Sequence, residues 1–168
     1  VLFLSRHASA SGTRCLTVHP IGNPRLSVSD QEPKLGGRAG RCPPPSSRMA
    51  RLLKAVKVRA AQVGLLHNSE EVQGPADFSV CPEATHHGPW LSTPACFVEI
   101  GSADDDWGRR DAAEVWVDVL MSELFGDEIR EATETDVVLI AVGGGHYAPK
   151  VMDIISGPKG HRVALGHV

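Results

Sequence analysis

Asp136-Val137-Val138-Leu139-Ile140-Ala141-Val142 is the segment that decides the fold. Its apolar run is uninterrupted, which is typical of a strand buried on both faces of a parallel sheet. A second apolar run covers residues 95–100, and residues 111–125 between the two runs carry apolar side chains at helical spacing. A strand, a helix and a strand in this order predict a right-handed βαβ unit. The sequence therefore predicts a mixed α/β fold with a largely parallel sheet flanked by helices.

The remaining apolar segments predict shorter elements on either side of this unit. Four short strands are expected, at residues 1–4, 15–19, 78–80 and 163–165. Residues 49–63 have the spacing of a helix with basic side chains on its exposed faces, and Gly64 ends it. In the helix at 111–125 we expect Trp116 and Met121 to lie in the core.

Length and composition are those of one globular domain. The chain has 168 residues, of which 42% are hydrophobic and 5% aromatic, and no apolar run reaches the length of a membrane span. The four cysteines show no Cys-x-x-Cys spacing, which indicates reduced thiols and a cytoplasmic protein, with nuclear or chloroplast placement left open. Because the first residue is Val1, we expect residues 1–168 to be a single catalytic domain, a fragment lacking N- and C-terminal parts of the full-length protein.

Positive charge is concentrated in the first part of the chain. Residues 1–60 hold 11 Lys and Arg against two acidic residues, whereas residues 61–168 hold six against 18. A basic half on an acidic chain favours a polyanionic partner, although a solvated surface without a partner fits equally well. The segment Gly36-Gly37-Arg38-Ala39-Gly40-Arg41 has the composition of a phosphate- or carboxylate-binding loop, or of a plain flexible loop.

Glu83-Ala84-Thr85-His86-His87-Gly88-Pro89 is the segment richest in chemically useful side chains. Neutral imidazole is the commonest protein ligand for zinc, and it is also suited to proton transfer near neutral pH. A surface turn that happens to carry two histidines is the alternative. The remaining histidines decide between the two interpretations.

Several other reactive side chains lie at or near the ends of predicted strands: His7, His19, Glu99, His146 and His167. Because ligands bind at the carboxyl ends of strands in open α/β sheets, we expect His7, Glu99, His146 and His167 to meet the His86-His87 pair at one edge. Gly143-Gly144-Gly145 lets backbone N–H groups approach an oxyanion or a phosphate, and Tyr147 can stack on a base. These features favour a hydrolytic site, in which either a metal or a histidine/glutamate base activates the water. The sequence has no Gly-x-Ser-x-Gly and no His-Glu-x-x-His, which argues against serine hydrolases and ordinary zincins.

Five segments in this order resemble the archaeal and plant-type D-aminoacyl-tRNA deacylases: LSRHASASG (4–12), TVHPIGN (17–23), EATHHGP (83–89), FVEIGS (97–102) and GGGHYAP (143–149). The resemblance implies a phosphorylase/hydrolase-like fold, a zinc cofactor and hydrolysis of the ester between a D-amino acid and the tRNA 3′ end. It also implies action on aldehyde-modified D-aminoacyl-tRNAs. Residues 68–76 are longer than the family pattern, as in a loop insertion.

With this resemblance, each candidate residue receives a role. We expect catalysis from Glu83, His86, His7 and His19. We expect substrate binding by Gly143, Gly144, Gly145, Tyr147, Arg6 and Ser102. We expect metal binding by His86, His87, His146 and Glu99, while the basic residues 48–57 meet the acceptor stem.

The expected partner is a D-aminoacyl-tRNA, bound by a monomer that does not contact a membrane. Two alternatives remain open at this point. A nucleoside phosphorylase or hydrolase on a similar fold would act on free nucleosides and ignore tRNA. A non-catalytic tRNA-binding fragment would bind RNA in a salt-dependent way without cleaving the ester.

Overall fold

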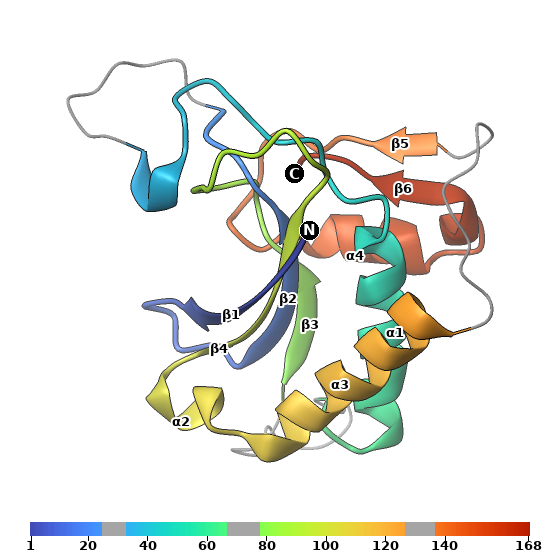
Figure 1. Ribbon diagram of the computed structural model, residues 1–168. Coiled ribbons are helices and arrows are strands. Elements are labelled where there is room, and N and C mark those ends of the chain that lie inside the picture. Colours follow the sequence, from blue (N-terminus) through green and yellow to red (C-terminus); the bar gives the residue numbers. More distant parts are fainter. Residues whose placement is uncertain (25–32, 67–77, 127–136) are drawn as a thin grey trace.

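A four-stranded sheet with helices on one side forms the centre of the molecule (Figure 1). The computed structural model describes residues 1–24, 33–66, 78–126 and 137–168. Its elements in chain order are β1 (Leu2–Ala8), β2 (Cys15–Pro20), η1 (Lys34–Gly36), α1 (Met49–Gln62), β3 (Ser79–Pro82), β4 (Cys96–Ser102), α2 (Asp104–Trp107), α3 (Arg110–Phe125), β5 (Val137–Leu139), α4 (Pro149–Ser156), η2 (Gly160–Arg162) and β6 (Val163–Leu165).

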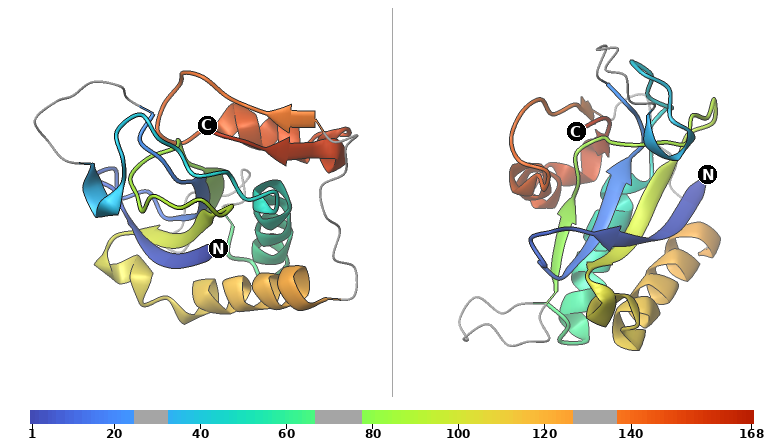
Figure 2. Two further views of the ribbon diagram at one scale, coloured as in Figure 1. Left: turned by 45° about the horizontal axis from the view of Figure 1, so that its top comes forward. Right: turned by 90° about the vertical axis from the view of Figure 1, so that its left-hand side faces the viewer.

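The sheet is mixed, as the sequence predicts. Its strand order is β1-β4-β2-β3, with β1 parallel to β4, β2 parallel to β3, and β2 antiparallel to β4. A separate parallel pair joins β5 to β6, beside α4 and beyond one end of the main sheet (Figure 2). Most strand pairings are therefore parallel, and the predicted fold class is confirmed.

The predicted βαβ unit is wrong in its pairing. β4 and β5 lie in different sheets, so α3 does not connect neighbouring parallel strands. The predicted strand at 137–142 is also shorter and less buried than expected: it ends at Leu139, and the side chains of Val138 and Val142 are 61% and 97% exposed. In the described residues β5 pairs only with β6, and the side chain of Val137 is also 61% exposed.

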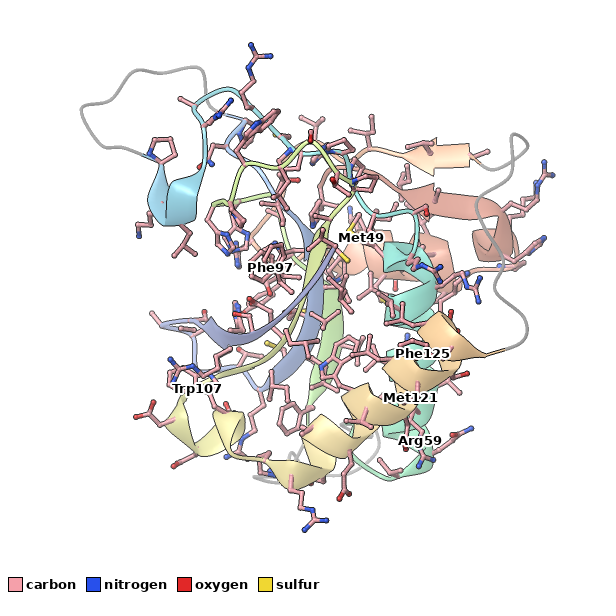
Figure 3. All side chains as sticks on the ribbon, viewed as in Figure 1. Met49, Arg59, Phe97, Trp107, Met121 and Phe125 are labelled. Carbon is pink, nitrogen blue, oxygen red and sulfur yellow. The ribbon has the colours of Figure 1, made fainter. Side chains whose placement is uncertain are left out.

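Alternation along the strands divides the side chains between the two faces of the sheet. Leu16, Val18 and Val98 point towards α1 and α3, where they join the main hydrophobic core with Leu52 and Leu53 of α1. The residues between them on β2 and β4 point to the other face. Figure 3 shows this division, with Met49 on the side of α1 and Phe97 on the opposite side of the sheet.

The buried stripe of α3 differs from the predicted one. Its buried residues are Ala112, Val115, Trp116 and Val119, which follow the spacing of one helix face. Trp116 therefore lies in the core as predicted, but Met121 is 57% exposed. Five residues further along a helix correspond to a rotation of about 140°, which turns Met121 away from α1. The sequence patterns also missed α4, a helix of eight residues.

No helix within the described ranges is long and apolar enough to cross a membrane.

Leu53→Ala tests the assignment of α1 to the core. Leu53 is fully buried, so its truncation should lower the free energy of unfolding by about 2–5 kcal/mol. Val58→Ala is the matched control, because Val58 lies on the same helix but is 57% exposed, and it should change the free energy by less than about 0.5 kcal/mol. Urea unfolding followed by circular dichroism measures both variants. Equal losses would contradict the placement of the helix.

Candidate active site

Polar side chains gather on the face of the sheet that α1 and α3 leave uncovered. His7 on β1, His19 on β2 and Glu99 on β4 are each no more than 4% exposed. Strand register brings them together, because Glu99 lies between Ser5 and Thr17 in the neighbouring strands. Burying ionisable groups is costly unless they are paired or liganded, so this cluster requires a chemical explanation.

Two loops add further side chains to this face. After β3 the chain continues beside the end of β2, and the backbone N–H of Gly22 donates to the carbonyl oxygen of His87 at 2.9 Å. The backbone N–H of Ala84 donates to the carbonyl oxygen of His146 at 2.8 Å, which joins the two loops. These backbone hydrogen bonds hold Glu83, His86, His87, His146 and Tyr147 over the sheet.

The imidazole of His7 lies between two carboxylates. Its Nδ1 is 3.2 Å from Oε2 of Glu83 and 3.3 Å from Oε2 of Glu99. Its Nε2 is 2.7 Å from the hydroxyl oxygen of Tyr147. Oε2 of Glu83 also contacts Nε2 of His146 at 2.7 Å. A continuous chain of hydrogen bonds thus connects β1, β4 and both loops.

These contacts change the pKa values of the three buried groups. Burial alone would lower the pKa of His7, but its hydrogen bonds to Glu83 and Glu99 raise that pKa to about 11. Burial alone would raise the pKa of each carboxyl group, but the hydrogen bond from His7 lowers that of Glu83. The imidazoles of His19 and His7 lower that of Glu99. Without a metal, the network therefore contains an imidazolium between two carboxylates.

A second group consists of three imidazoles whose Nδ1 atoms are already engaged. Each lies at hydrogen-bond distance from a backbone carbonyl oxygen: His19 from Pro20 at 3.0 Å, His86 from Ala84 at 2.7 Å, and His87 from Gly88 at 2.7 Å. With Nδ1 as the donor, each Nε2 keeps a lone pair available. Burial, followed by repulsion from His19, lowers the pKa of His86 to about 4, and burial also lowers the pKa of His87.

Two groups of side chains in this pocket have donor atoms close enough to hold a metal ion. In each group, His19 with His86 and His87, and His7 with Glu83 and His146, the candidate ligand atoms lie within 4.8 Å of one another. Nε2 of His19 is buried without a hydrogen-bond partner among the described residues, as are Oε1 of Glu83 and Oγ1 of Thr17. Backbone carbonyls that hold the opposite ring nitrogens are a common support of metal-binding histidines. The first group therefore fits a metal ion well.

Most of the predicted site residues line or adjoin one pocket of about 510 Å³. Arg6, His7, His86, His87, Glu99 and His146 are among its lining residues. Glu83 and Tyr147 lie behind them in hydrogen-bond contact with His7 and His146, and the ring centroid of His19 is 4.2 Å from that of His86. The histidine-histidine segment thus lines the same pocket as the other candidate residues, and it is not an isolated turn.

Other predicted residues lie outside the lining of this pocket. Ser102 donates through Oγ to the carbonyl of Thr13, and its backbone N–H donates to the buried carboxylate of Asp106. Gly143, Gly144 and Gly145 are exposed, and added Cβ atoms at the first two would meet no atom within 4 Å. His167 contacts Oγ1 of Thr85 at 3.1 Å.

The convergence is predicted correctly, but its position on the sheet is not. β1 extends to Ala8 and β4 to Ser102, so His7 and Glu99 lie within strands and not beyond their ends. Because β2 runs antiparallel to β4, their carboxyl ends point in opposite directions. The residues meet on a face of the sheet through side-chain alternation, and not at an edge.

Four lining residues were not predicted from the sequence: Ser5 and Ala8, which flank Arg6 and His7, and the more distant Asn23 and Lys34. Asn23 closes the segment TVHPIGN, and Lys34 directly precedes the glycine-rich segment 36–41, so both were adjacent to recognised motifs. The amide of Asn23 and the ammonium group of Lys34 do not by themselves form a sequence motif, so the sequence analysis did not identify them as site residues.

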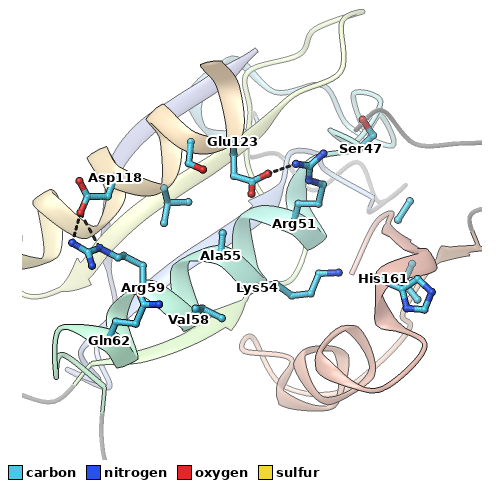
Figure 4. Close-up of a pocket in the computed structure, with 14 residues that line it drawn as sticks. Ser47, Arg51, Lys54, Ala55, Val58, Arg59, Gln62, Asp118, Glu123 and His161 are labelled. Carbon is cyan, nitrogen blue, oxygen red and sulfur yellow. Dashed lines mark hydrogen bonds and ion pairs between the residues drawn. The ribbon is translucent and has the colours of Figure 1, made fainter. Parts of the chain in front are cut away.

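A different hollow lies between α1, α3 and the region of η2 and β6 (Figure 4). This groove of about 550 Å³ is far from the histidines, because α1 covers the opposite face of the sheet. Its basic side chains are engaged: Arg51 lies 2.8 Å from Glu123, Arg59 lies 2.7 Å from Asp118, and Lys54 donates to the carbonyl of Gly160. The expectation that residues 48–57 meet an acceptor stem at the site is therefore not supported by their position.

The fold and the site together define a mixed α/β domain with a pocket of imidazoles and carboxylates, the class of site that hydrolytic enzymes use. The family model for D-aminoacyl-tRNA deacylases matches residues 1–168, and the chain belongs to this family. A D-aminoacyl-tRNA deacylase from Arabidopsis thaliana is 40% identical over 161 residues, which cover 92% of this chain and 47% of the relative. One from Thermoplasma acidophilum is 31% identical over 170 residues, covering 100% and 55%.

A solved crystal structure of a conserved protein of unknown function has the same fold. The two structures superpose with a TM-score of 0.72 and 29% sequence identity, over 99% of this chain and 50% of the other. The chain therefore spans about half the length of the relatives it matches.

His7→Asn tests the buried ion network in metal-free protein. Because the pKa of His7 is raised to about 11, its stabilising contribution is complete below pH 6.5 and is lost as the pH rises towards 11. Between pH 7.5 and 9.5 the free energy of unfolding of the unsubstituted protein should fall, by up to about 1 kcal/mol per pH unit, relative to that of the variant. Urea unfolding with a chelator present measures this difference. Parallel pH profiles would show that His7 is not held as an imidazolium.

Proposed function

We propose that this chain carries the catalytic site of a D-aminoacyl-tRNA deacylase, which hydrolyses the ester between a D-amino acid and the tRNA 3′ end. The observation that carries the proposal is the meeting of three imidazoles, whose Nδ1 atoms face backbone carbonyls, and a Glu83–His7–Glu99 ion network in one pocket. The names of the relatives support the substrate. By the same resemblance, aldehyde-modified D-aminoacyl-tRNAs are further substrates.

We assign zinc to the group formed by His19, His86 and His87. Three neutral nitrogen ligands that leave a coordination position open are the donor set of catalytic zinc sites. When bound, zinc supplies Lewis acidity and a water molecule of lowered pKa. The ligand set expected from sequence thus changes: His86 and His87 stay, His19 joins them, and His146 belongs to the neighbouring group. Glu99 belongs to neither group: its carboxylate oxygens lie 3.3 Å from Nδ1 of His7 and 3.7 Å from Nε2 of His19.

Proton transfer falls to His146, which Glu83 orients. A side-chain hydrogen bond of 2.7 Å joins the two residues, and His146 lines the pocket. An imidazole held by a carboxylate is the usual arrangement of a general base. His146 accepts a proton as water adds to the ester carbonyl, and the departing ribose oxygen of the tRNA then takes up a proton. The products are a free D-amino acid and uncharged tRNA.

His7 has a different role in this scheme. It lies between two carboxylates and behind the hydroxyl of Tyr147, so its proton is held firmly. A fixed positive charge in the pocket wall stabilises negative charge that develops on the ester carbonyl oxygen. Glu99 keeps His7 in place.

Hydrolysis of D-tyrosyl-tRNA and L-tyrosyl-tRNA tests the proposal. The D-ester should be cleaved and the L-ester spared. A chelator should lower the rate at least about 100-fold, and added zinc should restore it, since the metal supplies the activated water. Cleavage of free nucleosides with indifference to tRNA would favour the phosphorylase alternative. Tight tRNA binding without ester cleavage would favour the non-catalytic one.

Zinc content of purified variants tests the ligand assignment. His19→Ala, His86→Ala and His87→Ala should each lose the ion, since each removes one of the three nitrogen ligands. His161→Ala should retain it, because His161 lines the groove on the far face. His146→Ala should keep zinc but lose activity. Mass spectrometry measures the zinc content of the five variants and of the unsubstituted protein. Two ions per chain in the unsubstituted protein would instead assign the His7, Glu83 and His146 group to a second metal, and full occupancy in all variants would refute the assignment.

A further inference from the structure

Four cationic side chains beside the pocket have no acidic partner within the part of the chain that the structure describes. Arg6 and Lys34 line the pocket, and Arg38 and Arg41 follow Lys34 on the same loop. All four side chains are exposed. The basic residues of α1 differ in this respect, since Arg51 and Arg59 are paired with acidic residues of α3. We call Arg6, Lys34, Arg38 and Arg41 the cationic rim.

The loop that carries three members of the rim is fixed to the site by backbone hydrogen bonds. The N–H of Gly88 donates to the carbonyl of Lys34, and that of Trp90 to the carbonyl of Gly36, both at 3.0 Å. Gly88 packs so closely that an added Cβ would lie 2.3 Å from the backbone nitrogen of Gly37. The rim is therefore held in place before any ligand arrives, which reduces the entropic cost of binding.

Aromatic rings accompany two of the cations. The guanidinium of Arg38 lies 5.5 Å from the ring centre of Trp90, and that of Arg6 lies 4.6 Å from the ring centre of Trp107. Figure 3 shows Trp107 at the end of α2, on the side of β1. Guanidinium groups next to aromatic rings offer both charge for phosphates and flat surfaces for bases.

An unpaired amide in the pocket wall adds a donor. Asn23 lines the pocket, and its Nδ2 is buried without a hydrogen-bond partner among the described residues. Its backbone N–H donates to the carbonyl of Arg41 at 2.9 Å, which ties it to the rim loop. Asn23 therefore adds a polar side chain to the pocket wall beside the rim.

We propose that the cationic rim binds the phosphates of the single-stranded RNA 3′ end whose aminoacyl ester enters the pocket. This inference rests on the proposed function. The interior of the pocket holds the carboxylates of Glu83 and Glu99, which repel phosphates, whereas the rim attracts them. The charges therefore direct the RNA backbone to the rim and the ester to the histidines.

The test compares two triple variants that remove the same charge. Lys34→Ala, Arg38→Ala and Arg41→Ala together remove the loop part of the rim, while Lys57→Ala, Arg110→Ala and Lys159→Ala remove exposed cations elsewhere. Fluorescence anisotropy with labelled uncharged tRNA measures the dissociation constant at several salt concentrations. The rim variant should bind at least about 10-fold more weakly, and its log–log salt slope should fall by about two. The control variant should resemble the unsubstituted protein.

A substrate without phosphates separates binding from chemistry. In the rim variant KM for D-aminoacyl-tRNA should rise at least about 10-fold, whereas kcat/KM for a D-aminoacyl adenosine, which carries no phosphate, should fall by much less. If the unsubstituted protein cleaves D-aminoacyl-tRNA and the rim variant keeps its KM and salt slope, the inference fails and the proposed function stands. If neither ester is cleaved but the rim variant loses tRNA binding, the proposed deacylase function is refuted and the proposed RNA-binding role of the rim is supported. Equal losses in both triple variants would refute the rim.

Discussion

The imidazolium of His7 between the carboxylates of Glu83 and Glu99 is the interaction on which the site depends. Removing one partner from a buried ion group leaves an uncompensated charge, which costs far more than the intact group contributes. The three residues come from β1, β4 and the loop after β3, so their pairing fixes the relative positions of these segments. The indole N–H of Trp107 adds a hydrogen bond to the carbonyl of His7, which ties α2 to the same point. The contacts that set the chemistry of the pocket therefore also fix the geometry of the sheet.

Side-chain alternation lets a small sheet serve two purposes. On β4, Val98 packs into the core with α1 and α3, while Glu99 faces the imidazoles on the opposite side. The same holds on β2 for Val18 and His19. Burying ionisable groups on the polar face is destabilising, and the burial of apolar side chains on the other face offsets this cost. This arrangement also explains why the side of the sheet that the helices cover, where the charges are paired, takes no part in the proposed reaction.

Patterns in the sequence predict whether a segment is a helix or a strand better than they predict which elements lie next to it. Periodicity placed α1 and α3 correctly, because an amphipathic face is a local property. It failed for β5, since strand pairing depends on contacts far apart in the chain, and an apolar run such as that around Val138 looks the same whether or not a neighbour covers it. The histidine cluster was foreseen from its motifs, but its place on a face of the sheet was not, because β2 runs antiparallel to β4. The phase of α3 was likewise ambiguous, since Met121 continues an apolar stripe that faces outward.

Charge distribution links the fold to the proposed reaction. The chain is acidic as a whole, with a net charge of −3, which by itself does not favour a polyanion such as tRNA. The cations of α1 do not compensate, because Arg51 and Arg59 are neutralised by α3. Those beside the pocket remain unpaired within the described ranges, next to an interior where burial lowers the pKa of His86 to about 4 and also lowers the pKa of His87. Cations at the mouth and neutral ligands inside suit a substrate whose charge lies in its RNA backbone and whose reactive ester is uncharged.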